Sequence, residues 1–173
     1  MTPRGRINLR SARDSEARSL YALIAANLEE GHLLPRTLSE LAVHATRFVV
    51  ATRGRRVVGC AELAALSPLV AEVRSLAVDA GERGHGVGTL IVEELRRRAR
   101  AEGFEKLCAF THAPAYFIQM GFSIVPHTWV LEKVTTDCIK CPLFRTCGKY
   151  AMVVPLESPY DVDRAAAAVV RYA

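Results

Sequence analysis

Residues 78–89 read Val-Asp-Ala-Gly-Glu-Arg-Gly-His-Gly-Val-Gly-Thr, and they decide the fold because a strand pattern ends and a helical pattern begins within them. Gly84, Gly86 and Gly88 carry no Cβ, so the backbone between strand and helix can approach a ligand closely. The first amide groups of a helix lack an intrahelical partner and carry the positive end of the helix dipole. With Arg83 adding charge at its edge, the stretch predicts an anion site suited to a pyrophosphate.

This glycine-rich stretch differs from two common nucleotide-binding loops. No Gly-Lys-Ser or Gly-Lys-Thr follows it, so it is not a Walker loop. It follows the third strand of an antiparallel run, and no acidic residue at the end of a following strand is placed to bind a ribose, as the dinucleotide fingerprint requires. A tight turn that binds nothing is the alternative interpretation.

Outward from the loop, apolar periodicity predicts both strands and amphipathic helices. The predicted strands cover 6–12, 48–52, 57–65, 71–78, 106–111, 123–126, 129–133 and 150–156. The predicted helices cover 14–27, 37–45, 86–102 and 114–120, with an alanine-rich helix over 161–172. This order predicts an α+β or mixed α/β fold with a central sheet covered by helices.

Length and composition indicate one globular domain. A chain of 173 residues has room for a sizeable core, and an apolar share of 50% argues against disorder. No apolar run reaches the roughly 18 residues of a membrane helix, and the first residues lack the apolar centre of a signal peptide. We therefore expect a cytoplasmic protein without a membrane partner.

The charge balance permits an anionic partner, because 23 Lys and Arg stand against 18 Asp and Glu, a formal net charge of +5. Basic residues cluster at 53–56 and 96–100, but no aromatic residues interleave with them as a single-strand nucleic-acid surface requires. We expect solvated surface there and no nucleic-acid partner. An anionic cofactor and substrate explain the charge better.

The five cysteines fall into two groups. Cys60 and Cys108 stand in apolar strand-like runs and are expected to be small buried hydrophobes. Cys138, Cys141 and Cys147 cluster, and three interpretations stay open: reduced cysteines packed in a loop, three ligands of a metal, or a redox-sensitive pair. No metal is predicted.

The stretch Arg83-Gly-His-Gly-Val-Gly88 resembles the R/Q-x-x-G-x-G/A motif of the GNAT acetyltransferases, whose loop binds the pyrophosphate of acetyl-CoA. The resemblance covers 6–157 and implies one domain over 1–157. The alanine-rich residues after it predict a C-terminal helical tail over 158–173. It also implies the GNAT fold, a mostly antiparallel sheet of six to seven strands flanked by helices, with a splayed strand pair holding the cofactor. The residues it implies for acetyl-CoA are Leu76, Ala77, Val78, Arg83, Gly84, His85, Gly86, Val87, Gly88, Thr89 and Phe117.

Three segments, at 31–36, 71–74 and 137–152, resemble the short, stand-alone bacterial N-acetylglutamate synthases. This closer resemblance implies acetyl transfer to the α-amine of L-glutamate, the first step of arginine biosynthesis. The alternatives are a GNAT enzyme acting on another amine, such as glutamine, another amino acid or a protein N-terminus, and a non-catalytic module that binds acyl-CoA or nucleic acid. A homodimer is left open.

Acetyl transfer needs a neutral amine, so a carboxylate must take the ammonium proton directly or through water. Glu72 is the first candidate for this base, because the strand period of two would put it on one face with Arg74, Leu76 and Val78. GNAT bases commonly occupy the matching point of this strand. Glu62 on the neighbouring strand is a weaker alternative.

A tyrosine of the helix after the next strand often protonates the leaving thiolate in this superfamily, but Phe117 holds that position here and Tyr116 is expected to point elsewhere. The thiolate would then leave unassisted, with His112 as a candidate polar helper. A glutamate substrate would require cations for its two carboxylates, and the candidates are Arg36, Arg74 and Lys133.

Overall fold

The structure, a computed structural model, describes residues 5–28 and 33–156. The tail predicted over 158–173 and the domain boundary at 157 lie outside these residues. The elements, in chain order, are β1 (Ile7–Ser11), η1 (Asp14–Glu16), α1 (Ala17–Ala26), α2 (Leu38–His44), η3 (Ala45–Arg47), β2 (Phe48–Arg53), β3 (Arg56–Ala65), β4 (Val70–Val78), η4 (Ala80–Glu82), α3 (Val87–Ala101), β5 (Lys106–Thr111), α4 (Pro114–Ile118), β6 (Ser123–Val125), η5 (His127–Trp129), α5 (Leu131–Thr136), η6 (Cys138–Lys140), η7 (Phe144–Thr146) and β7 (Tyr150–Pro155).

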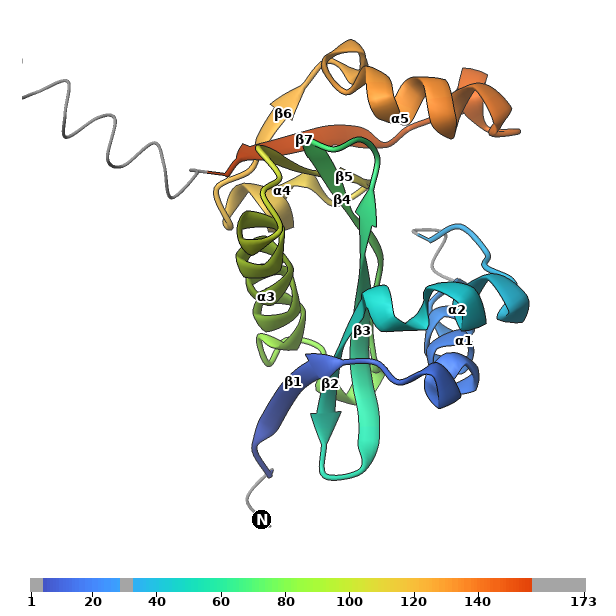
Figure 1. The fold of residues 1–173 in the computed structure, drawn as a ribbon, viewed down its shortest axis with the longest axis vertical. Helices are drawn as coiled ribbons and strands as arrows, with labels where there is room; N and C mark the ends of the chain where they lie inside the picture. The colour runs from blue at the N-terminus through green and yellow to red at the C-terminus, as the bar shows by residue number, and fades with distance from the viewer. Residues whose placement is uncertain (1–4, 29–32, 157–173) are drawn as a thin grey trace, which may run out of the picture.

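A mixed sheet runs through the described part of the chain, with strand order β1-β2-β3-β4-β5-β7-β6 (Figure 1). Within that part, β4 and β5 pair in parallel and all other neighbours pair antiparallel. The predicted α+β fold with a mostly antiparallel sheet is confirmed.

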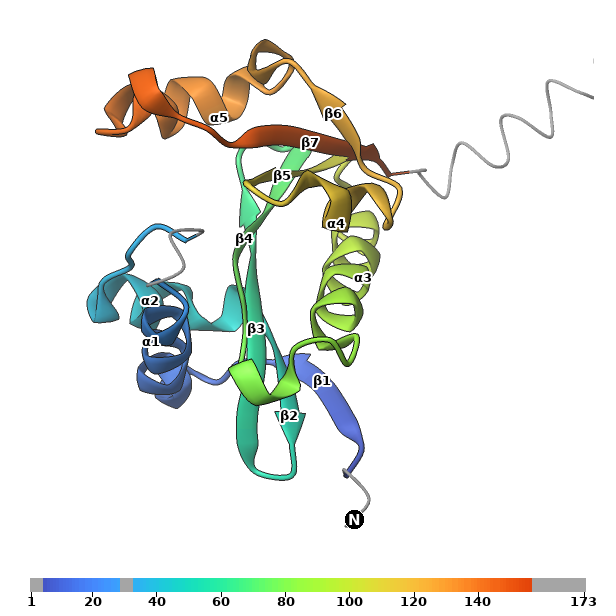
Figure 2. The same ribbon diagram turned by 180° about the vertical axis from the view of Figure 1, so that it is seen from behind.

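Helices cover both faces of the sheet (Figures 1 and 2). On one face the buried stripe of α3, which includes Val87, Ile91 and Leu95, packs with residues of β2 to β5 in one hydrophobic cluster. On the other face α1 and α2 pack against β2 and β3, with Leu20 and Leu41 fully buried. The α2 helix starts at a capping box, in which the Thr37 side chain accepts from the Glu40 amide.

The parallel strands β4 and β5 separate where the chain approaches the glycine-rich loop. They pair only from Val70–Lys106 to Val73–Ala109. Beyond that point β4 continues along β3 to Val78, whereas β5 continues along β7. The predicted splayed strand pair is therefore present, and it leaves one edge of β4 without a strand partner.

A β-bulge in β4 overturns one prediction from the strand period. Glu62 pairs with Arg74 and Cys60 pairs with Ala77, so two residues of β4, Ser75 and Leu76, face one residue of β3. Ser75 adopts φ 55°, an uncommon value for a residue with a side chain. Because of this extra residue, the side chains of β4 after the bulge point to the opposite face of the sheet from the one that a strict period of two predicts.

As a result, Glu72 and Arg74 do not share a face with Leu76 and Val78. The latter two pack on the α3 side together with Val73. The bulge thus lets one strand present apolar side chains to one face and charged side chains to the other.

The strand predicted over 129–133 is also wrong. Residues 127–129 form η5, and Leu131–Thr136 form the helix α5. The run Trp-Val-Leu is continuously apolar, as in a buried strand, but Lys133 and Asp137 are ion-paired at the i,i+4 spacing of a helix.

The basic clusters are largely ion-paired. Arg53 pairs with Glu82 and Arg56 pairs with Asp79, whereas Arg97 and Arg98 both pair with Glu94.

No helix in the described ranges has the length and apolar character needed to cross a membrane.

Candidate active site

A pocket of about 920 Å³ opens where β4 and β5 diverge. It is lined by β4, β5, the glycine-rich loop, the start of α3, α4, the segment before α2 and the region from α5 to β7. Of the site residues predicted from sequence, Ala77, His85 and the alternative base Glu62 do not line it, and all the others do. Ala77 instead packs into the core on the α1 side.

The glycine-rich loop forms one end of the pocket. Gly86 is the N-cap of α3 with φ 76°, and no side chain caps the helix. A Cβ built at Gly84 or Gly86 would meet no atom within 4 Å, so both glycines border open space. The free amide groups at the start of this 15-residue helix therefore border a space that can hold an anion.

Gly88 is required for a different reason. A Cβ at this position would lie 2.5 Å from the hydroxyl oxygen of Tyr116. Tyr116 lines the pocket, so the expectation that it points elsewhere is wrong. Burial raises the pKa of its phenol, while the Thr89 side chain beside it acts in the opposite direction.

Phe117, at the usual tyrosine position, lines the pocket but is almost buried. Its ring packs edge-to-face against Tyr116 and Phe122, at centroid distances of 5.4 and 5.2 Å. A phenyl ring has no proton to donate, so its role is to close the apolar wall of the pocket.

Arg83 connects the loop to the N-terminal helices. Its Nε donates to the Val78 carbonyl at 3.2 Å, and its Nη2 donates to the Asn27 side chain at 2.7 Å. These bonds hold the guanidinium at the rim of the pocket, beside the start of α3.

At the other end of the pocket Glu72 is buried, with 3% of its surface exposed. Arg74 donates to its carboxylate through Nε at 2.9 Å and Nη2 at 2.6 Å. The Nζ atom of Lys133 in α5 lies 2.9 Å from the same carboxylate. The predicted base and two predicted substrate-binding residues are therefore in direct contact.

Asp137 completes this group and was missed from the sequence. Its carboxylate accepts from Arg74 at 2.6 Å and from Lys133 at 2.8 Å. Burial alone would raise the pKa of Asp137, but the hydrogen bond from Lys133 and the charge of Arg74 outweigh it and lower the pKa. Two cations and two carboxylates, Glu72, Arg74, Lys133 and Asp137, form a neutral network that we call the acceptor network.

Arg36 lies beside this network and is itself held by carboxylates. Its Nη1 donates to Glu62 at 2.8 Å and to the Ser75 hydroxyl at 3.1 Å, and its Nε donates to Glu40 at 3.2 Å. The Glu62 side chain is 2% exposed and does not line the pocket, which favours Glu72 over Glu62 as a group that substrate can reach.

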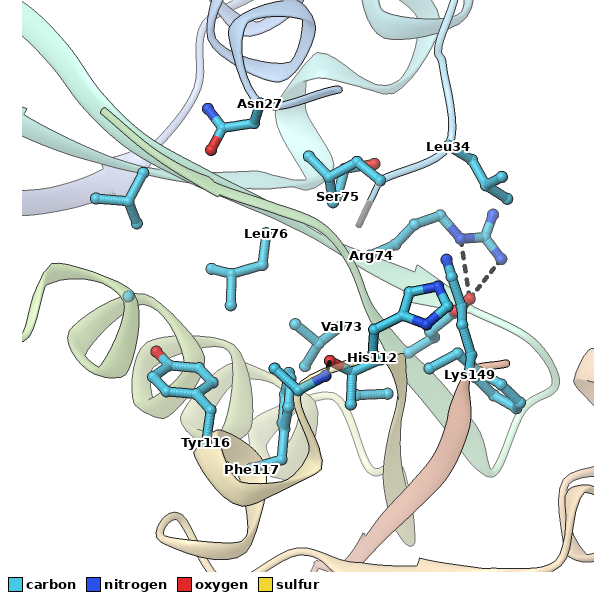
Figure 3. A pocket seen from close by; sticks show the side chains of 18 of the residues that line it. Asn27, Leu34, Val73, Arg74, Ser75, Leu76, His112, Tyr116, Phe117 and Lys149 are labelled. Carbon is cyan, nitrogen blue, oxygen red and sulfur yellow. Dashed lines mark hydrogen bonds and ion pairs between the residues drawn. The ribbon is translucent and has the colours of Figure 1, made fainter. Parts of the chain in front are cut away.

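Lys149 was also missed, because a lone lysine before a strand carries no pattern. It lines the pocket, and it forms no ion pair or hydrogen bond with any described residue. Burial and the neighbouring Lys133 lower its pKa. Figure 3 shows Arg74, His112 and Lys149 together at one side of the pocket, with Tyr116 toward α3 at the other.

Comparisons with known proteins agree with this geometry. A protein from Chlorobaculum tepidum described as an uncharacterized N-acetyltransferase is 30% identical over 148 residues, 86% of this chain and 96% of that protein. An amino-acid acetyltransferase of Mycobacterium tuberculosis is 34% identical over 79 residues, 46% of this chain and 45% of that protein.

The fold is also that of a solved enzyme. The N-acetylglutamate synthase of Neisseria gonorrhoeae, in complex with coenzyme A and N-acetyl-glutamate, matches with a TM-score of 0.80 at 22% identity. The match covers 88% of this chain and 36% of that one, so this chain spans about a third of that enzyme. The model of the acetyltransferase (GNAT) family matches residues 12–122, well over half of the sequence. The chain belongs to the GNAT acetyltransferase family.

Proposed function

We propose that this chain transfers the acetyl group of acetyl-CoA to the α-amine of L-glutamate. The observation that carries the proposal is the pocket, which has an anion-binding helix start at one end and four cationic side chains at the other. These cations are Arg36, Arg74, Lys133 and Lys149. An acceptor with two carboxylates requires such a group, since buried carboxylates must be paired.

GNAT acetyltransferases use acetyl-CoA, so the predicted cosubstrate is confirmed by family membership. The residues present fit this molecule, because Gly84 and Gly86 border open space at the start of α3. We assign the pyrophosphate to the amide groups there, with Arg83 at the rim. The pantetheine would lie along the unpaired edge of β4 at 76–78, and the molecule supplies the acetyl thioester.

Lys149 is the side chain best suited to take a substrate carboxylate. Arg74 and Lys133 already share Glu72 and Asp137, whereas Lys149 has no anionic partner at hydrogen-bond distance among the described residues. Two lysines face the same space, so an anion placed between Lys133 and Lys149 relieves their mutual repulsion. We therefore add Lys149 to the proposed substrate-binding residues.

Glu72 is the proposed base, and its contacts define when it can act. In the structure both Arg74 and Lys133 donate hydrogen bonds to the carboxylate of Glu72. A substrate carboxylate that binds Arg74 and Lys133 would release Glu72 toward the ammonium group of the same substrate. Glu72 then takes one proton, directly or through water, and the neutral amine forms the C–N bond as the C–S bond breaks. The second proton leaves the nitrogen of the new amide through water and balances the departing thiolate.

The thiolate leaves with the electron pair of the C–S bond. Phe117 cannot protonate it, and a thiol with a pKa of about 8.5 leaves without an acid. The Tyr116 hydroxyl lies against Gly88, on the side where the pyrophosphate is assigned, so we give it a packing role.

Two relatives support an amino-acid acceptor. The matched protein of Mycobacterium tuberculosis is named as an amino-acid acetyltransferase, and the structure from Neisseria gonorrhoeae holds N-acetyl-glutamate. Glutamate as the acceptor of this chain is our inference from these names and from the charges of the pocket.

A second acceptor class is favoured by one observation. The four carboxylates Glu40, Glu62, Glu72 and Asp137 are bonded to three of the four cations at this end of the pocket, Arg36, Arg74 and Lys133. Of these four cations, Lys149 alone has no bonded anion among the described residues. One unpaired cation suffices for an amino acid with a single carboxylate, such as glutamine. Steady-state rates with glutamate and glutamine at equal concentrations separate the two.

The substitution Arg36→Ala tests the carboxylate-binding role directly. We expect the KM for glutamate to rise about ten-fold or more, because a charged hydrogen bond is lost. The KM for acetyl-CoA should stay the same, since Arg36 lies at the opposite end of the pocket from α3. An unchanged KM for glutamate would rule out Arg36 as a substrate clamp.

A further inference from the structure

Three of the five cysteines line the pocket near the acceptor network: Cys138, Cys141 and Cys147. The other two, Cys60 and Cys108, are buried in the core, and burial raises the pKa of Cys60 to about 12. At neutral pH these two remain protonated and packed. Oxidation chemistry is therefore confined to the group at the pocket.

The backbone turn between Cys138 and Cys141 brings their Cα atoms close to each other. The amide of Cys141 donates to the carbonyl of Cys138 at 3.0 Å, which closes the turn of η6. The Cα atoms at the two ends of such a turn lie within about 7 Å. A disulfide spans Cα distances of about 4.4–6.8 Å, so this pair can be joined with little backbone movement.

The other ways of using these thiols have less support. All three cysteines are free thiols in the structure. Within the described ranges, no three His, Cys, Asp or Glu side chains gather as ligands of a metal. Cys147 follows a separate turn, η7, and its charge also acts on Cys138, but no backbone hydrogen bond among the described residues closes a turn between it and either of the other two.

The turn of η6 is directly coupled to the acceptor network. Asp137, the residue before Cys138, holds both Arg74 and Lys133, and these two hold Glu72. Burial raises the pKa of the Cys138 thiol, and the nearby charge of Lys133 acts in the opposite direction. A disulfide that tightens this turn would therefore move Asp137, and with it the side chains around Glu72.

We propose that Cys138 and Cys141 form an oxidisable dithiol at the acceptor end of the pocket, and that a hydroperoxide converts it to a disulfide that weakens binding of the acceptor. One thiolate attacks the peroxide oxygen, the O–O bond breaks, and a sulfenic acid forms as the alcohol or water leaves. The second thiol displaces the hydroxyl group as water. Two thiols are oxidised and one peroxide is reduced. The effect on the acceptor rests on the proposed function, whereas the disulfide does not.

The test uses the full reduced chain treated with hydrogen peroxide. We expect intact mass spectrometry to show the loss of two hydrogen atoms, peptide mapping to join Cys138 to Cys141, and dithiothreitol to reverse both. The KM for the acceptor amine that the enzyme turns over should rise about five-fold or more, with the affinity for acetyl-CoA unchanged. Cys138→Ser and Cys141→Ser should abolish the mass loss and the KM change, whereas Cys147→Ser should keep both.

Other results overturn the proposal. These are oxygen addition without a disulfide, a bond that includes Cys147, one equivalent of zinc bound by the three thiols, or a Cys138–Cys141 disulfide that leaves the KM unchanged. If no amino acid is an acceptor, the proposed function fails, but the mass and mapping results still decide whether the dithiol exists.

Discussion

The ammonium group of Lys133 in α5 lies 2.9 Å from the carboxylate of Glu72 in β4, and this contact joins the C-terminal region of the described chain to the strand that borders the cofactor loop. The pair is the link between the acceptor network and the sheet, because the same lysine also holds Asp137. Acceptor binding and the local fold therefore depend on the same side chains.

Replacing Lys133 with Met should reduce both stability and acceptor binding. Glu72 is buried and would keep only Arg74 as a bonded partner, so we expect the free energy of unfolding to fall by about 2 kcal/mol. Urea unfolding at neutral pH measures this. Arg97→Met is the control, since Arg97 is 67% exposed and water screens its pair with Glu94, so its loss should change the free energy of unfolding much less. Equal losses in the two variants would refute a special role for the buried pair.

Replacing Gly86 with Val should abolish acetyl-CoA binding. The new side chain would enter the open space at the start of α3, and the left-handed backbone adds strain of about 1–2 kcal/mol. Gly54→Val is the matched control, because Gly54 has a similar φ of 61°, also borders open space, and does not line the pocket. Calorimetric titration with acetyl-CoA should show loss of binding only for Gly86→Val. Normal affinity in that variant would exclude the loop as the pyrophosphate site.

The lowered pKa of Lys149 predicts a pH dependence of acceptor binding. A lysine with a lowered pKa loses its charge at a lower pH than a free lysine, so the KM for glutamate should begin to rise below the usual lysine range near 10.5. Lys149→Met should raise the KM about ten-fold at neutral pH and remove this alkaline rise. Lys149→Arg should keep a low KM with no alkaline rise, since arginine stays charged. If Lys149→Met behaves as the parent does, this lysine does not bind the acceptor.

Hydrogen bonds from Arg10, at 2.7 and 2.6 Å, hold the pKa of Glu16 at about 2, against an ordinary 4.5. A carboxylate with a lowered pKa stabilises the fold fully above about pH 4.5, and this contribution is lost as the pH falls toward 2. Arg10→Met should therefore lower the free energy of unfolding at pH 7 by up to about 1 kcal/mol, because the pair is partly exposed. The difference from the parent should vanish near pH 2. A difference that persists there would have another cause.

The sequence predicts the glycine-rich loop and the elements around it well, because each follows from local chemistry. Gly86 has the left-handed backbone at the start of α3, and Gly88 lies in close contact with Tyr116. The buried stripe of α3 follows from helical spacing. Most of the cofactor side of the pocket could therefore be predicted.

The acceptor side could not be predicted to the same extent, because it depends on non-local pairing. The bulge at Ser75 reverses the faces of β4 and is set by the pairing with β3. Asp137 and Lys149 reach the pocket from segments distant in sequence from β4. One signal was available, since the i,i+4 spacing of Lys133 and Asp137 indicates the helix that was predicted as a strand.

The release of coenzyme A from acetyl-CoA by the purified chain, measured with a panel of amino acids, tests the central claim most directly. We predict that L-glutamate gives the highest kcat/KM, that glutamine and aspartate are at least about ten-fold poorer, and that the product is N-acetylglutamate. Equal or faster turnover of an amine without a carboxylate, or no turnover of any amino acid while acetyl-CoA still binds, would contradict it.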